Sequence, residues 1–379
     1  MCFLIVWSAV IYGYGFSQSW LRDSDCDLQQ RQEEYESFRQ GVYPTRTLEP
    51  GIPKDARVPY TVYPPYALPM FMPLYEPFGK LQGRVVIQLL SLAGLAAIAA
   101  YGTRLLRPAG TASAILGALA AVAIPGNGSA IAVGQFSIIC AASVLAQMNL
   151  LDRGRPLAAG ACWALAMLKP QIGLSFAALF FVRREWLGLA WGVTILLGLS
   201  LVACWWTEVS PWAVVDHWML RMYTGFASST SVSGQFAEAI EVNPRIIHIT
   251  AAALLVMIPI VAIRIMRRSS RADTLNVAAV AALCSSVLIY HRAYDRIMMF
   301  PVLFVALAAT AQRPTPWHIF ISVTLALSLW LPEKIIPEIP LLFLVRPAVW
   351  VALGIAMFMS QRRSAATKDD VQPHSTDSA

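Results

Sequence analysis

The first candidate for chemistry is a polar stretch near the start of the chain that carries carboxylates at helical spacing. Asp27 is followed by Arg31 at i+4 and by Glu34 at i+7, so a helix would present all three side chains on one face. Asp27 suits an N-cap or first-turn position. A carboxylate beside an arginine can act as a general base, and the neighbouring Asp23 and Asp25 are rival bases. The alternative is an ion-paired helix exposed to water.

A second polar cluster lies late in the chain between two apolar runs, where residues 290–296 read Tyr-His-Arg-Ala-Tyr-Asp-Arg. Ionisable groups between apolar helices are costly to bury. Arginine and protonated histidine donate charge-assisted hydrogen bonds to phosphate oxygens. We therefore predict that His291 and Arg292 bind an anionic phosphate, with Tyr294 and Asp295 beside them. The alternative is an aromatic and basic anchor.

Two shorter features complete the set of candidates. Lys169 and Pro170 lie between two short apolar segments, where a lysine must meet either water or an anion. We predict that Lys169 also binds the phosphate; the alternative is a hairpin tip exposed to water. Gly134 and Gln135 follow a glycine-rich turn at 126–128, which would direct Gln135 toward a cavity or leave it in a plain loop.

The elements that position these residues follow from composition. The chain has 379 residues, 57% of them hydrophobic and 13% charged, and its mean hydropathy is +0.57. An average soluble domain has roughly 25% charged residues. Apolar runs without strict alternation favour membrane helices over a transmembrane barrel, because a helix needs about 20 apolar residues to cross a bilayer. The sequence therefore predicts an all-α integral membrane protein.

The predicted organisation has four parts: a first transmembrane helix at 1–16, a long extracytoplasmic loop at 17–83, a multi-helix membrane domain at 84–360 and a disordered cytoplasmic tail at 361–379. Together the apolar segments predict about 10–12 transmembrane helices, provided that 156–182 is a hairpin turning at Lys169 and Pro170. The segments after the first loop are 85–106, 111–125, 133–150, 156–168, 170–182, 186–206, 246–266, 274–290, 296–311, 316–331 and 341–360.

Orientation follows from lysine and arginine, which concentrate at every second loop. Placing these loops inside puts 14 basic and 6 acidic residues on the inner side, and the first loop and the 290–296 cluster on the outer side. We therefore predict a multi-pass protein of the cell (inner) membrane with its site on the extracytoplasmic face.

Several classes are disfavoured. The net charge of +7 is spread over many short loops, so no nucleic-acid partner is predicted. The six cysteines have no ligand-like spacing, and the sequence Asp23-Ser-Asp25 is a weak match to a metal motif. No metal and no cofactor are expected.

The ordered motifs resemble a known family. The first loop resembles that of GT-C membrane glycosyltransferases; the later turns and the 290–295 cluster resemble glycosyltransferase family 87. The first-loop residues are Asp27-Leu28, Arg31, Glu34, Gly41, Tyr43-Pro44 and Tyr63-Pro64-Pro65; the later ones are Gly134-Gln135, the turn from Asp152 to Arg155, Gly160, Lys169-Pro170, Arg183-Arg184 and Tyr290 to Asp295. The chain departs from the family pattern at Arg296, where a leucine is common.

The resemblance implies a GT-C-type helical bundle that transfers a hexose, usually mannose, from a polyprenyl-phosphate donor to a lipid or glycan acceptor with inversion. It also implies that Asp27 deprotonates the acceptor hydroxyl. His291, Arg292 and Lys169 would stabilise the departing phosphate. Candidates for lining the substrate pocket are Arg31, Glu34, Tyr63, Gln135, Tyr294 and Asp295.

Two other classes stay open. A transporter or flippase for a lipid-linked or anionic substrate could use the same outer basic cluster, but it predicts ionisable residues deep within several helices. A structural subunit of an envelope assembly could use the first loop for docking. The charges lie chiefly in the loops, which favours the enzyme.

Overall fold

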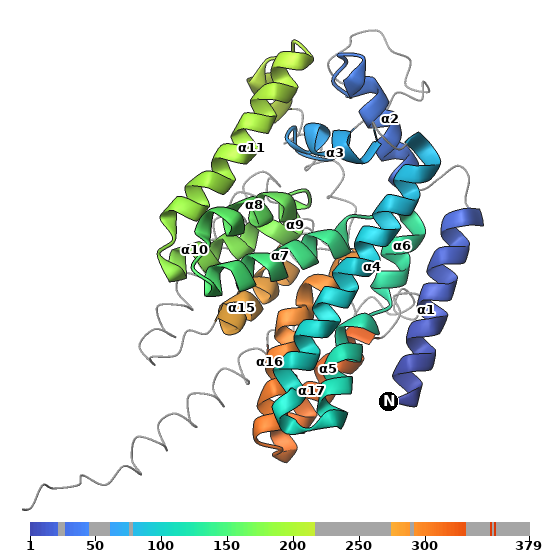
Figure 1. Ribbon diagram of the computed structural model, residues 1–379, viewed down its shortest axis with the longest axis vertical. Helices are drawn as coiled ribbons and strands as arrows, with labels where there is room; N and C mark the ends of the chain where they lie inside the picture. The colour runs from blue at the N-terminus through green and yellow to red at the C-terminus, as the bar shows by residue number, and fades with distance from the viewer. Residues whose placement is uncertain are drawn as a thin grey trace, which may run out of the picture.

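The computed structural model describes residues 1–21, 27–44, 61–75, 79–216, 274–288, 292–330, 349–350 and 352–353. Within these ranges the regular structure consists of α- and 3-10 helices, as predicted (Figure 1). The helices are α1 (Cys2–Leu21), α2 (Asp27–Arg39), α3 (Ala67–Tyr75), α4 (Gly79–Leu106), η1 (Arg107–Ala109), α5 (Thr111–Val122), α6 (Gly126–Val133), α7 (Ser137–Asp152), α8 (Pro156–Ala166), α9 (Pro170–Gly173), η2 (Leu174–Ala177), α10 (Ala178–Arg183), α11 (Trp186–Trp206), α15 (Thr274–Leu288), η3 (Ala293–Met299), α16 (Phe300–Gln312) and α17 (Pro316–Trp330).

Three helical stretches of the described chain are long and apolar enough to cross a membrane: Gly83–Ala109, Trp186–Trp206 and Ala293–Gln312. A fourth span results if the bent pair α5 and α6 is counted as one. α11 buries little of its surface and exposes Leu187, Leu197 and Leu201, which suits a face that contacts lipid. α7, α8, α15 and α17 are apolar but shorter. The chain is thus an all-α membrane protein, and the number of 10–12 spans stays a prediction.

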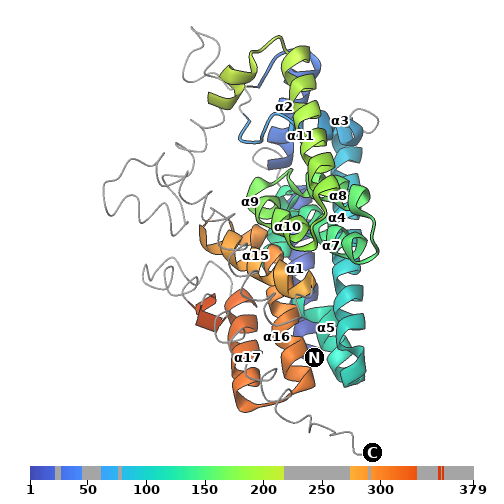
Figure 2. The same ribbon diagram turned by 90° about the vertical axis from the view of Figure 1, so that its left-hand side faces the viewer.

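The helices form two groups (Figures 1 and 2). α4, α5, α16 and α17 run roughly side by side, and α7 to α11 with α15 form the second group. α2 and α3 lie at the end of the molecule where α11 ends and α4 begins. α4 and α5 approach closely because Gly102 has no side chain where they meet. A Cβ there would come within 2.3 Å of the Gly117 carbonyl oxygen.

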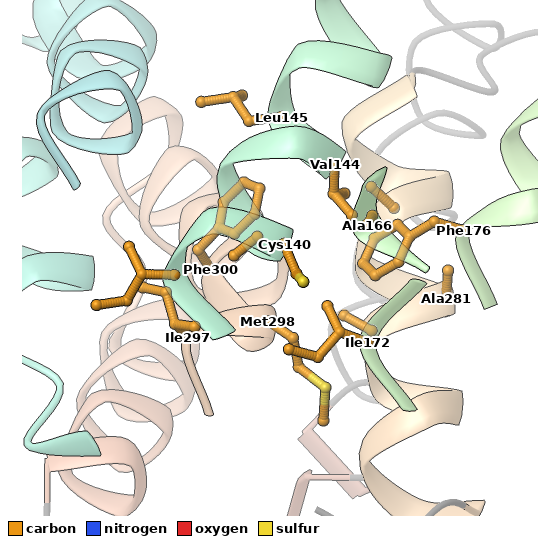
Figure 3. Close-up of a cluster of buried hydrophobic side chains, with 14 of the residues drawn as sticks. Cys140, Val144, Leu145, Ala166, Ile172, Phe176, Ala281, Ile297, Met298 and Phe300 are labelled. Carbon is orange, nitrogen blue, oxygen red and sulfur yellow. The ribbon is translucent and has the colours of Figure 1, made fainter. Parts of the chain in front are cut away.

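The two groups meet in one hydrophobic core (Figure 3). Side chains from α7, α9, η2, α15, η3 and α16 converge there, and Cys140, Ile172, Phe176, Ala281 and Met298 are all buried. This packing fixes the start of α7 relative to η3. The relative position of these two elements determines the geometry of the candidate site.

The hairpin predicted at 156–182 turns at Lys169 and Pro170, as the sequence predicts. α8 ends at Ala166 and α9 begins at Pro170, while Lys169 has the extended backbone that a following proline imposes. The indole N–H of Trp163 donates to the Gly173 carbonyl oxygen at 2.9 Å, joining the two arms. The second arm, expected as one segment over 170–182, is divided into α9, η2 and α10.

The start of the chain differs in detail from its predicted boundaries. α1 extends to Leu21, beyond the expected 1–16. The segment 17–83, predicted as a polar loop, contains α2, α3 and the first turn of α4. α2 buries Leu28, Tyr35 and Phe38, so it is an integral part of the fold.

Candidate functional site

α2 lies directly on the turn between α6 and α7. Gly134 ends α6 with a φ of +70°, which a residue with a side chain rarely adopts. A Cβ at Gly134 would lie 2.6 Å from the Leu28 Cβ, so the glycine also provides the space that α2 occupies. At its other end α2 is held by α11, because the Trp206 indole N–H donates to the Phe38 carbonyl oxygen at 2.7 Å.

Asp27 is the first residue of α2, as predicted, and it meets Gln135. The Gln135 amide Nε2 donates to Asp27 Oδ2, and the Tyr63 hydroxyl donates to Gln135 Oε1 at 3.3 Å. Gln135 and Tyr63 are buried, whereas Asp27 is partly exposed. Three residues far apart in the sequence thus form one hydrogen-bond chain that ends on a carboxylate.

Arg31 and Glu34 form a second part of the site. The Arg31 Nη1 lies 2.5 Å from Glu34 Oε2, and the two side chains are 3% and 0% exposed. The Arg31 guanidinium also covers the Tyr63 ring at 4.6 Å. Burial raises the pKa of Glu34 to about 8, against the opposing effects of Arg31 and the Thr61 hydroxyl. The alternative expected this helix to be ion-paired and exposed to water; the ion pair is present, but it is buried.

Lys169 meets an anion within the protein. Its Nζ lies 2.7 Å from Asp295 Oδ1 and 2.9 Å from the Ser137 Oγ, and Lys169 and Asp295 are 3% and 0% exposed. The Ser137 hydroxyl donates to the same carboxylate oxygen at 2.6 Å, and the Arg292 N–H donates to the other at 3.1 Å. The lysine ammonium also lies 4.3 Å from the Tyr294 ring centre. The alternative of a lysine tip exposed to water is wrong.

These two parts adjoin through the start of α7. Gln135 holds Asp27, and Ser137, two residues later, holds Lys169 and Asp295. The ring of Phe136 between them packs edge-on against Tyr63. Tyr63 also interacts electrostatically with Tyr294. The turn Gln135–Ser137 therefore joins seven of the predicted site residues: Asp27, Arg31, Glu34, Tyr63, Lys169, Tyr294 and Asp295.

The carboxylates of this site differ in their partners. Glu34 and Asp295 are each in an ion pair. In the part of the chain that the structure describes, Asp27 has no cationic side chain within ion-pair distance and is held by the neutral amide of Gln135. Asp27 is therefore the carboxylate that is free to bind an incoming proton donor.

Some predicted residues fall elsewhere. Arg292 is the N-cap of η3, and it is exposed. His291, Asp23 and Asp25 lie outside the described residues. Among the residues that are described, no group of three or more His, Cys, Asp or Glu side chains could hold a metal ion.

Ser137 is the site residue that sequence reasoning missed. It begins an apolar helix, where a single serine is common and carries no signal of its own. Its proximity to the Gly134-Gln135 turn was the available clue. Tyr66 was also missed; its hydroxyl donates to the Met167 carbonyl oxygen at 2.9 Å and ties α3 to the hairpin.

The fold and the site define a helical membrane protein that gathers a carboxylate held by a neutral amide and two buried ion pairs, as far as the described residues show. The chain belongs to glycosyltransferase family 87, whose family model matches residues 60–290. It is thus a membrane glycosyltransferase. The matched range includes Tyr63, Gln135 and Lys169, whereas Asp295 lies shortly after it and Asp27 lies well before it. No curated protein and no solved structure matches the chain.

Proposed function

We propose that the protein transfers a hexose, mannose in the first instance, from a polyprenyl-phosphate donor to a lipid or glycan acceptor on the extracytoplasmic face of the cell membrane. One observation carries this proposal. A single turn, Gln135–Ser137, joins Asp27, a carboxylate that has no cationic partner among the described residues, to a buried cation, Lys169. Transfer from a sugar phosphate needs a base for the acceptor and positive charge for the leaving group.

In the proposed step, the acceptor hydroxyl attacks the anomeric carbon from the face opposite the phosphate. The new carbon–oxygen bond forms as the bond to the phosphate oxygen breaks, and that oxygen keeps the electron pair. Asp27 takes the proton of the hydroxyl and later releases it to water. The products are the glycosylated acceptor, with the anomeric configuration inverted, and polyprenyl phosphate. The phosphate leaves as an anion, so no protein acid is required.

Positive charge for the phosphate comes from the second part of the site. Arg292 is exposed at the start of η3, and His291 precedes it in the sequence. Lys169 can turn toward a phosphate because Asp295 keeps two other hydrogen bonds, from the Ser137 hydroxyl and the Arg292 N–H. The carboxylate is therefore still stabilised when the lysine ammonium moves.

The fold supports the assignment of the face. α4 begins beside α3, at the end of the molecule that holds α2, and ends near Arg104 and Arg107. A helix of 28 residues spans about 42 Å at 1.5 Å per residue. Arg104 and Arg107 thus lie about that far from the start of α4, which supports an outer site under the positive-inside rule.

The test is reconstitution in lipid vesicles with polyprenyl-phosphate mannose and membrane glycolipid extract, following release of polyprenyl phosphate. We expect release that requires the extract and falls at least a hundredfold in Asp27→Asn, in line with the loss of a general base. Glu36→Gln is the matched control, because Glu36 is an exposed carboxylate on the same helix. Full activity of Asp27→Asn would refute the assignment of the base.

Failure of the wild-type protein with mannose leads to a panel of other polyprenyl-phosphate sugars. Release with a different sugar would overturn mannose and keep the donor class. The same vesicles can report whether a labelled polyprenyl-phosphate sugar crosses the bilayer. Such movement, with no release from any donor of the panel, would overturn the proposed transfer reaction in favour of the transporter alternative.

A further inference from the structure

We infer that Gln135 is a positioning residue for the base: it fixes one oxygen of the Asp27 carboxylate and leaves the other directed to the acceptor hydroxyl. This inference rests on the proposed function of Asp27. The sequence pattern gave this glutamine only as a candidate for lining the substrate pocket.

The direction of the Gln135 amide is determined by its neighbours. A carboxylate only accepts hydrogen bonds, so the amide group that faces Asp27 Oδ2 must be the NH₂. The carbonyl Oε1 then faces the Tyr63 hydroxyl, which donates to it at 3.3 Å. A flipped amide would place two acceptors together at Asp27. The chain from Tyr63 through Gln135 to Asp27 therefore has one consistent set of donors.

The remaining surroundings hold this chain in place. Gln135 is only 5% exposed and follows the left-handed Gly134, so its backbone is fixed by the turn. The Tyr63 ring is held between the Arg31 guanidinium on its face and Phe136 at its edge. Burial raises the pKa of Tyr63 well above its usual value, which keeps the hydroxyl protonated as a donor.

The consequence lies in how Asp27 meets its substrate. Asp27 begins a helix and is partly exposed, and a carboxylate at such a position can rotate between several hydrogen-bond arrangements. Holding Oδ2 removes this freedom before the acceptor arrives. Reactions gain rate when the reacting groups are already oriented.

The other titratable groups around Asp27 do not replace Gln135. Glu34 interacts electrostatically with Asp27 from the same helix but is paired with Arg31. Tyr63 interacts with it from the opposite side and reaches it through the glutamine. Within the described residues, Gln135 is the group that donates a hydrogen bond directly to the Asp27 carboxylate.

The experiment compares Gln135→Met with wild type in the vesicle assay. Methionine keeps the length of the side chain and removes the donor. We expect kcat to fall about tenfold with little change in the KM for the donor. Tyr63→Phe keeps the ring and removes the hydroxyl, so it should lower kcat by less and also leave the KM unchanged.

Gln88→Met is the matched control. Gln88 is also buried and donates to another helix, with its Nε2 2.8 Å from the Ser19 Oγ, but it does not touch the site. A structural role for Gln135 predicts that both methionine variants lower thermal stability and leave kcat unchanged. That result would overturn the inference.

The failures of the two proposals can be told apart. Full activity of Asp27→Asn refutes the base. An inactive Asp27→Asn with an unchanged kcat in both Gln135→Met and Tyr63→Phe refutes only the positioning role.

Discussion

Replacing Lys169 with methionine should destabilise the protein because it leaves Asp295 as an unpaired charge in the interior. Lys169 and Asp295 are almost fully buried and 2.7 Å apart. Breaking a buried ion pair from one side costs about 3 to 5 kcal/mol. Asp295 keeps hydrogen bonds from the Ser137 hydroxyl and the Arg292 N–H, which favours the lower value. At roughly 2 °C per kcal/mol, the apparent Tm of Lys169→Met should fall by about 6 °C.

The double variant Lys169→Met/Asp295→Asn separates stability from function. Removing both charges of a buried pair is often close to neutral, so the double variant should recover most of the lost Tm. It should not recover transferase activity, because the proposed donor phosphate has lost its lysine. The control is Arg183→Met, which breaks the Arg183–Asp152 ion pair. Those side chains are 37% and 49% exposed, and such pairs contribute about 0 to 1 kcal/mol.

The assay is the loss of the monodisperse peak in size-exclusion chromatography after heating in detergent, with vesicle activity measured on the same samples. An unchanged Tm in Lys169→Met would refute the reasoning about the buried pair. Recovery of both Tm and activity in the double variant would show that the pair is structural and that Lys169 does not act on the donor.

Three further predictions concern α2 and its supports. Gly134→Ala should destabilise the protein by about 1 to 3 kcal/mol in thermal unfolding, because its Cβ collides with the facing side chain of α2; Gly154→Ala, also at positive φ but in open space, should cost less. Burial raises the pKa of Glu34 from 4.5 to about 8, so folding favours its protonated form. The stability that this group contributes should be fully present below about pH 4.5 and should be lost as pH rises through about 8. A series of Tm values against pH should show this dependence in wild type and not in Glu34→Gln. Trp206→Phe should lose about 1 kcal/mol by removing a hydrogen bond to a main-chain carbonyl of α2, whereas Trp205→Phe, at an exposed position, should be neutral in the same assay.

The sequence was most informative where a pattern has a single local cause. The helical face of Asp27, Arg31 and Glu34 follows from spacing alone, and the helix that carries them begins at Asp27 as predicted. The break at Lys169 and Pro170 follows from the restriction that proline places on the preceding residue. The all-α membrane class follows from composition and run length.

The partners of the charged residues could not be predicted in the same way. The alternatives for Lys169 were water or an anion, and the choice depends on Asp295, which lies 126 residues further along the chain. Such a pairing is set by how η3 packs against α7, and spacing within the sequence carries no information about it. Ser137 was missed for the same reason, since only its tertiary neighbours distinguish it from other serines in apolar helices.

The distribution of charge in the site explains why its turn is built from neutral residues. Lys169 and Asp295 are neutral as a pair, and this limits the cost of burying both charges. A charged residue in place of Gln135 would bind Asp27 as an ion pair or repel it. A cation there would compete with the acceptor for both carboxylate oxygens, and a second carboxylate would share its proton. A neutral amide donor orients Asp27 and leaves its charge available, so glutamine is the residue type that the proposed chemistry requires at this position.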